Sequence, residues 1–87
     1  MSTAELIRLR LASLAPARLE LVDESHLHAG HAGARSGGGH FRLLIVSDAF
    51  SGKKTLARQR LVFDALGELM RKEIHALSIQ ARTPDEV

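Results

Sequence analysis

Four of the five histidines in this 87-residue chain lie in one short stretch, HLHAGHAGARSGGGHF, at residues 26–41. The same stretch contains five of the seven glycines, the residues that restrict the backbone least. Neutral imidazole is a ligand for zinc, copper and iron, so histidines on a flexible segment could bind a metal ion or a metal cofactor. The alternative is a solvated loop that tolerates many sequences, and the rest of the chain must distinguish the two.

The fifth histidine, His75, lies in the stretch IHALSIQAR, which alternates like a strand. His75 is in phase with Leu77, Ile79 and Ala81, so the pattern predicts that it lies on the apolar face. A histidine there is either a core residue or, because it begins the strand, a ligand that a neighbouring loop can reach. A fixed His75 facing loop histidines would form a two-histidine half-site. Two ligands do not complete a tetrahedral site, so the remaining ligands would come from a partner.

Basic side chains gather where the second helix is predicted to begin. They form either a solvated helical face or a surface for phosphate or an acidic partner, and they are Lys53, Lys54, Arg58 and Arg60. The segment SGKKT does not match a phosphate-binding loop, because Ser47 occupies the place of its first glycine and Lys54 that of its Ser or Thr. The sequence GHAG at 30–33 matches the Gly-x-x-Gly of KH domains but lies between two predicted strands. No Ser/His/Asp order or carboxylate pair stands out, so we expect no enzymatic activity.

The composition is that of one small globular domain, with 45% apolar and 25% charged residues and a net charge of +2. Such a small charge does not by itself indicate a nucleic acid or membrane partner. The chain has no cysteine, which excludes disulfides, a thiol nucleophile and an iron–sulfur cluster held by its own thiolates. No stretch approaches the roughly 18 apolar residues of a membrane span, and the charges in residues 1–15 argue against a secretory signal. We therefore expect a cytoplasmic protein of the bacterial type, with a mature organellar protein as the alternative.

Apolar periodicity predicts alternating helices and strands in a single domain, residues 1–87. Ser2 and Glu5 have the spacing of a capping box, and Pro16 marks the end of the first helix. A flexible His/Gly-rich loop at about 26–39 separates two strands that we expect to pair antiparallel. The predicted helices are 2–15, 55–72 and a short turn at 83–87, and the predicted strands are 17–25, 40–48 and 74–82. These elements predict a two-layer α+β domain with the helices on one face of the sheet.

Within the long helix, Gly67 lowers helix stability by about 1 kcal/mol relative to Ala, which predicts a bend or a close packing contact. The apolar face of this helix is predicted to consist of Leu56, Phe63, Leu66 and Met70, which follow one another in steps of 7, 3 and 4 residues.

Several motifs in a fixed order resemble the BolA family over residues 6–86. The resemblance is carried by LELVDES, the histidine-bearing loop, HFRLLIVSDAFSGKKTLARQRLVFDAL and IHALSIQARTPDE. Its markers are Asp23-Glu24-Ser25, His40-Phe41, Phe50-x-Gly52, Arg58-x-Arg60 and His75-Ala76-Leu77. The resemblance implies a class II KH-like fold with the order α-β-β-α(α)-β-α, a three-stranded sheet and helices on one face.

The same resemblance implies a function, because BolA-like proteins pair with monothiol glutaredoxins and share a 2Fe-2S cluster across the heterodimer. In the family, the glutaredoxin side supplies its active-site cysteine and a glutathione thiol. The BolA-like side supplies the strand histidine, which matches His75, and a loop ligand, which falls on His28 with His31 as the alternative. The missing cysteines agree with this division, and the isolated chain is expected to be a monomer without the cluster. Gln59, where many members have histidine, and the long glycine-rich loop depart from the family pattern, and the loop leaves open which histidine binds.

Two other functions stay open at the level of sequence. One is a DNA-binding transcriptional regulator that uses the KH-like surface and the basic start of the long helix; sequence selectivity at physiological salt would distinguish it. The other is a stand-alone zinc or nickel buffer built on the histidine loop, which predicts metal binding that survives His75→Ala. Whether the cluster would be delivered in iron–sulfur trafficking or sensed in iron or redox regulation is also open.

Overall fold

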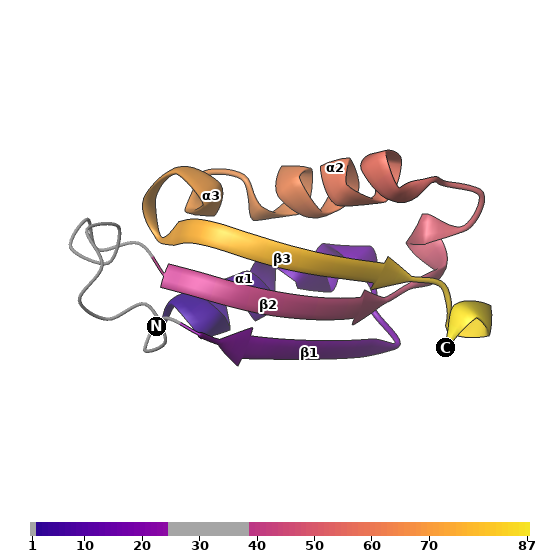
Figure 1. The fold of residues 1–87 in the computed structure, drawn as a ribbon, viewed down its shortest axis with the longest axis horizontal. Coiled ribbons are helices and arrows are strands. Elements are labelled where there is room, and N and C mark those ends of the chain that lie inside the picture. The colour runs from indigo at the N-terminus through magenta and orange to yellow at the C-terminus, as the bar shows by residue number, and fades with distance from the viewer. Residues whose placement is uncertain (1, 25–38) are drawn as a thin grey trace.

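The computed structural model describes residues 2–24 and 39–87 of the chain. Their helices are α1 (Thr3–Leu11), α2 (Thr55–Leu66) and α3 (Leu69–Lys72), and their strands are β1 (Arg18–Asp23), β2 (Gly39–Val46) and β3 (Ile74–Arg82) (Figure 1). Single 3-10 turns lie at Ala12–Leu14, Asp48–Phe50 and Pro84–Glu86. Among these described helices, none is long and apolar enough to cross a membrane.

The sheet has the order β1-β2-β3, with β2 in the centre. β1 pairs antiparallel with β2, placing Leu21 opposite Leu43, and β3 pairs parallel with β2, placing Phe41 opposite Leu77. The predicted antiparallel pair is therefore confirmed. The third strand lies beside β2 and not beside β1.

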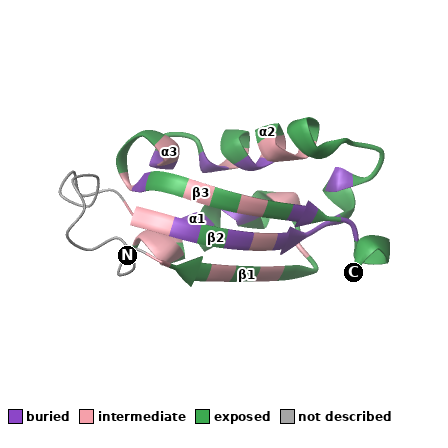
Figure 2. Ribbon diagram, in the orientation of Figure 1, coloured by how far each residue is buried: buried purple, intermediate pink, exposed green. Residues whose placement is uncertain are grey.

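The helices cover one face of this sheet. Alternate residues of β2, Phe41, Leu43 and Ile45, are buried and belong to the same core cluster as Ile7 of α1 and Leu66 of α2. The intervening residue Arg42 is exposed on the other face. Figure 2 shows this burial along β2, in contrast to the mostly exposed β1. The predicted class, a two-layer α+β domain with a three-stranded sheet, is confirmed.

Local sequence signals identify most helix ends correctly. Ser2 is the N-cap of α1, where its hydroxyl accepts a hydrogen bond of 3.1 Å from the Glu5 amide. Gly67 ends α2 with a φ of 55°, a left-handed value that glycine adopts without a steric penalty. The predicted long helix is accordingly split into α2 and α3.

The apolar face predicted for the long helix is only partly correct. Leu56 and Phe63 are 65% and 37% exposed, whereas Val62, Leu66 and Leu69 are buried. Both sets have helical spacing, so the helix carries two apolar stripes that overlap at Leu66. Periodicity alone does not determine which stripe faces the sheet, and the structure places Val62 rather than Phe63 in the core.

Candidate functional site

A β-bulge places His75 at the start of β3. Gly39 lies opposite Ile74 and His40 lies opposite Ala76, so His75 is the extra residue of β3 without a directly opposite residue on β2. A bulge shifts the alternation of side chains and re-aims the inserted residue. Ile74 is buried and His75 is exposed. The prediction that His75 lies on the apolar face is therefore wrong, because the period-2 pattern assumes an uninterrupted strand.

The imidazole of His40 packs against that of His75. The two ring centroids are 5.0 Å apart, and the ring planes are tilted by 42°. His40 is half-buried, and its Nε2 atom is buried from solvent, in contrast to the exposed His75. Sequence reasoning did not assign His40 to the site, although its position at the start of β2 could have indicated it once β2 and β3 were known to run parallel.

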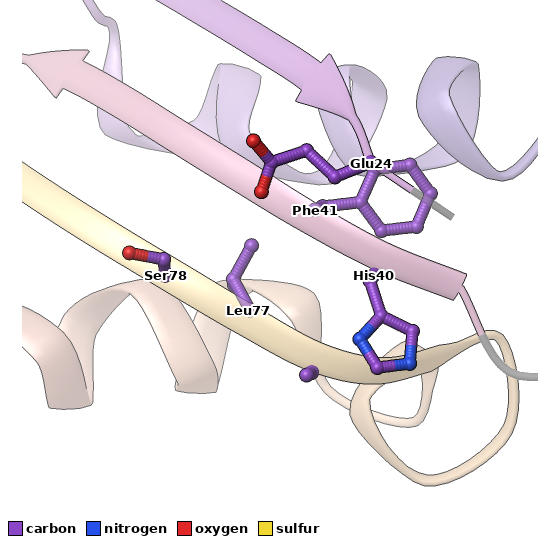
Figure 3. Close-up of a pocket in the computed structure, with 6 residues that line it drawn as sticks. Glu24, His40, Phe41, Leu77 and Ser78 are labelled. Carbon is purple, nitrogen blue, oxygen red and sulfur yellow. The ribbon is translucent and has the colours of Figure 1, made fainter. Parts of the chain in front are cut away.

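An open pocket of about 310 Å³ adjoins the histidine pair. It is lined by Glu24, His40, Phe41, Ala76, Leu77 and Ser78 (Figure 3). The Glu24 carboxylate lies 2.6 Å from the guanidinium of Arg42, which neutralises its charge. Within residues 2–24 and 39–87, no three His, Cys, Asp or Glu side chains come together as a metal site.

The candidate loop ligands His28 and His31 lie outside the described residues. The residues on either side of that loop are described, and both are anchored at the same end of the sheet as His75. The amide of Glu24 donates a hydrogen bond of 2.8 Å to the carbonyl of His40. The amide of Gly39 donates a hydrogen bond of 2.9 Å to the carbonyl of Glu73. The chain therefore leaves the sheet after β1 and rejoins it at β2, at the end of the sheet where β3 begins.

The basic residues lie at the opposite end of the sheet, around the start of α2 and the end of β3. Lys53, Lys54 and Arg60 are exposed. Lys53 and Lys54 line an open pocket of about 520 Å³ together with Thr55, Arg58, Arg82 and Glu86. This surface is positively charged with one carboxylate at its border, so it can attract an anion through Lys53, Lys54 and Arg82.

Arg58 differs from its basic neighbours because it is bound within the chain. Its guanidinium donates to both carboxylate oxygens of Glu86, at 2.6 and 3.0 Å, and to the carbonyl oxygen of Ala81, at 3.0 Å. Its side chain is only 13% exposed. We call Arg58, Glu86 and Thr83 the C-terminal clasp, since Thr83 and Glu86 also form a capping box around the last 3-10 turn.

Hydrogen bonding in this clasp shifts the pKa of Glu86. The guanidinium of Arg58 and, next in size, the amide of Thr83 stabilise the carboxylate and lower its pKa from 4.5 to about 2. The same contact with Glu86 raises the pKa of Arg58. The short turn predicted at 83–87 is confirmed as the 3-10 turn Pro84–Glu86, and its ion pair to α2 is an addition that the sequence pattern did not show.

Both the sequence and the α+β fold of the chain are similar to those of known proteins. The model of the family described as "BolA-like protein" covers residues 11–86, so the chain belongs to the BolA-like family. The solved BolA domain of SufE1 from Arabidopsis thaliana superposes with a TM-score of 0.86 at 46% identity, covering all of this chain and 98% of that one.

Two curated relatives contain a similar region within proteins of different length. SufE-like protein 1, chloroplastic/mitochondrial, of Arabidopsis thaliana is 49% identical over 79 residues, which are 85% of this chain and 21% of that protein. The DNA-binding transcriptional regulator BolA of Escherichia coli (strain K12) is 39% identical over 75 residues, 86% of this chain and 69% of that protein. The chain thus spans about a fifth of the length of the first relative and about two thirds of the second.

Proposed function

We propose that this chain is the BolA-like partner of a monothiol glutaredoxin, with which it shares a 2Fe-2S cluster through histidine ligands. The observation that carries the proposal is the exposed His75 on a bulge, next to the two anchoring points of the histidine-bearing loop. His75 would be the strand ligand and His28 the loop ligand, with His31 as the alternative. The role is non-catalytic and cytoplasmic, in iron–sulfur trafficking or in iron and redox regulation.

The donor set fits such a cluster. Imidazole is a good ligand for iron, and an exposed ring at a strand start can meet a cluster carried on another protein. The chain has no cysteine, so the thiolates must come from the glutaredoxin and from glutathione. When bound, a cluster with two histidine ligands on one iron is a one-electron centre with a higher potential than an all-thiolate cluster. In this division of roles, the chain's own residues bind, orient and shield one side of the cluster.

Co-expression with a monothiol glutaredoxin tests the proposal. We expect a coloured heterodimer whose visible circular dichroism differs from that of the glutaredoxin homodimer, and we expect His75→Ala to remove that difference. Gln80→Ala, an exposed residue on the same strand, is the matched control and should leave the spectrum unchanged. An unchanged spectrum for a folded His75→Ala protein would refute the proposal.

The loop ligand needs a separate comparison, because His26, His28 and His31 are close enough in sequence to replace one another. We expect His28→Ala and His31→Ala each to weaken the cluster spectrum partially and the double variant to abolish it. A complete loss in His28→Ala alone would assign the loop ligand to that residue.

The basic end of the sheet favours a second candidate function, DNA binding. Lys53, Lys54 and Arg82 surround an open pocket, and one relative is named a DNA-binding transcriptional regulator. Under this hypothesis, Lys53→Ala with Lys54→Ala should weaken duplex DNA binding and reduce its salt dependence, whereas His75→Ala should not. Equal affinity for all sequences at physiological salt would count against a regulator.

A further inference from the structure

We propose that His40 is the positioning residue for His75: its ring fixes the orientation in which the His75 imidazole is presented. This inference rests on the proposed function, because it assigns His75 the role of ligand. It is carried by the ring contact across the bulge, at a centroid distance of 5.0 Å. Packing of His40 against His75 also holds in the isolated chain, so the contact itself can be tested without a cluster.

The bulge creates the need for such a residue. An ordinary residue of β3 has a partner directly opposite on β2, and side-chain packing across the pair restricts its rotamers. His75 has no opposite residue, and it is exposed, so its backbone position alone leaves the ring free to rotate. A metal ligand loses affinity when the groups around it do not fix its ring, typically by 10–100-fold.

The surroundings of His40 make it suitable for this task. It lies opposite Ala76, whose small side chain leaves room for the His40 ring to extend over β3, as Figure 3 shows. Its own carbonyl accepts the amide of Glu24 at 2.8 Å, which fixes the backbone at the start of β2. The half-buried ring of His40 on the regularly paired β2 can therefore support the exposed ring of His75 at the bulge of β3.

The burial of the two rings divides their roles. Nε2 of His40 is buried from solvent, so that nitrogen is not accessible to a cluster approaching on another protein. His75 is exposed and precedes Ala76, which lines the pocket together with His40. We therefore assign the support to the flat ring of His40 and the ligand to the nitrogen of His75.

Two variants separate the ring from its nitrogens. His40→Phe keeps an aromatic ring of similar extent against His75, and His40→Ala removes it. In the isolated protein, NMR should show restricted rotation of the His75 ring in the parent and in His40→Phe, and rotamer averaging in His40→Ala. In the glutaredoxin complex, His40→Ala should lose the cluster about tenfold faster than the parent, and His40→Phe should restore most of its lifetime.

Leu44→Ala is the matched control, since Leu44 is half-buried on the same face of the same strand, four residues from His40. It should change neither the His75 rotamers nor the cluster lifetime. Equal loss of the cluster in His40→Phe and His40→Ala would overturn the inference, because His40 would then act through a nitrogen. Unchanged His75 rotamers in His40→Ala would overturn it as well. The NMR result does not depend on whether His75 is a ligand. Failure of the proposed function can therefore be distinguished from failure of this inference.

Discussion

His75 and Arg58, at opposite ends of the sheet, differ in how far their polar groups are bound within the chain. At the start of β3, a bulge exposes His75, and its ring contacts that of His40. At the other end, about 25 Å along the nine-residue strand, Arg58 is bound to Glu86 and to the carbonyl of Ala81. Polar groups bound within the chain contribute to its stability, whereas an accessible nitrogen contributes to binding. Under the proposed function, the contrast assigns His75 to a partner and the contacts of Arg58 to stability.

The largest expected effect is that of His75→Ala on cluster occupancy, compared with its effect on stability. His75→Ala should reduce cluster occupancy in the glutaredoxin complex by at least about tenfold. Because His75 is exposed, the same change should alter the free energy of unfolding by less than about 0.5 kcal/mol. Visible circular dichroism and urea unfolding measure the two quantities. A large loss of stability in His75→Ala would break the comparison, since the histidine end would then also be structural.

Gly67→Ala provides a reference for a purely structural defect away from both ends. An alanine Cβ at position 67 has only the Arg10 guanidinium within 4 Å, at 3.8 Å, so no clash is involved. The φ of 55° is nevertheless unfavourable for alanine, and we expect a destabilisation of about 1–2 kcal/mol. Urea unfolding should show it, with an unchanged cluster spectrum in the complex. A stability equal to that of the parent would mean that the backbone at Gly67 relaxes freely.

Arg58→Ala should lower the stability of the chain and leave the cluster unchanged, whereas His75→Ala should do the reverse. It removes the partner of Glu86 and the donor to Ala81, and we expect a fall in the melting temperature of about 5 °C with the cluster spectrum retained. Arg60→Ala is the matched control, since Arg60 is an exposed arginine on the same helix. Loss of the cluster in Arg58→Ala would contradict the assignment of this end to stability.

The smallest expected effect is the pH dependence of the clasp. The pKa of Glu86 is about 2 in the folded chain against an ordinary 4.5, so the unfolded chain binds more protons between these values. The contribution of Glu86 to stability is therefore complete above pH 4.5 and is lost as the pH falls towards 2. Glu86→Gln should lower stability at pH 7 and flatten its decline over this range in acid unfolding curves. An unchanged slope would exclude Glu86 as a contributor.

Sequence patterns predicted the local structure of this chain well because each signal was local in origin. The Ser2 cap, the helix break at Gly67 and the final turn at Thr83 depend on residues within a few positions of one another. The antiparallel pair was also predictable, since the two strands follow each other in the chain.

The features that define the candidate site depend on contacts distant in sequence. The bulge at His75 exists only because Gly39 and His40 pair with β3, more than thirty residues away along the chain. The choice between Val62 and Phe63 as a core residue likewise depends on how α2 rotates against the sheet. The alternating pattern around His75 assigned its side chain to the wrong face, because the pattern alone does not show the bulge.

The hydrogen bond from Arg58 to Ala81 has a consequence for how molecules of this protein behave in concentrated solution. β3 is an outer strand of the described sheet, and the unpaired carbonyls of such strands can bind a strand of another molecule and start aggregation. Arg58 occupies one of these carbonyls and adds a positive charge beside it. A strand added at this part of the edge of β3 would have to displace the hydrogen bond of Arg58 and approach its positive charge.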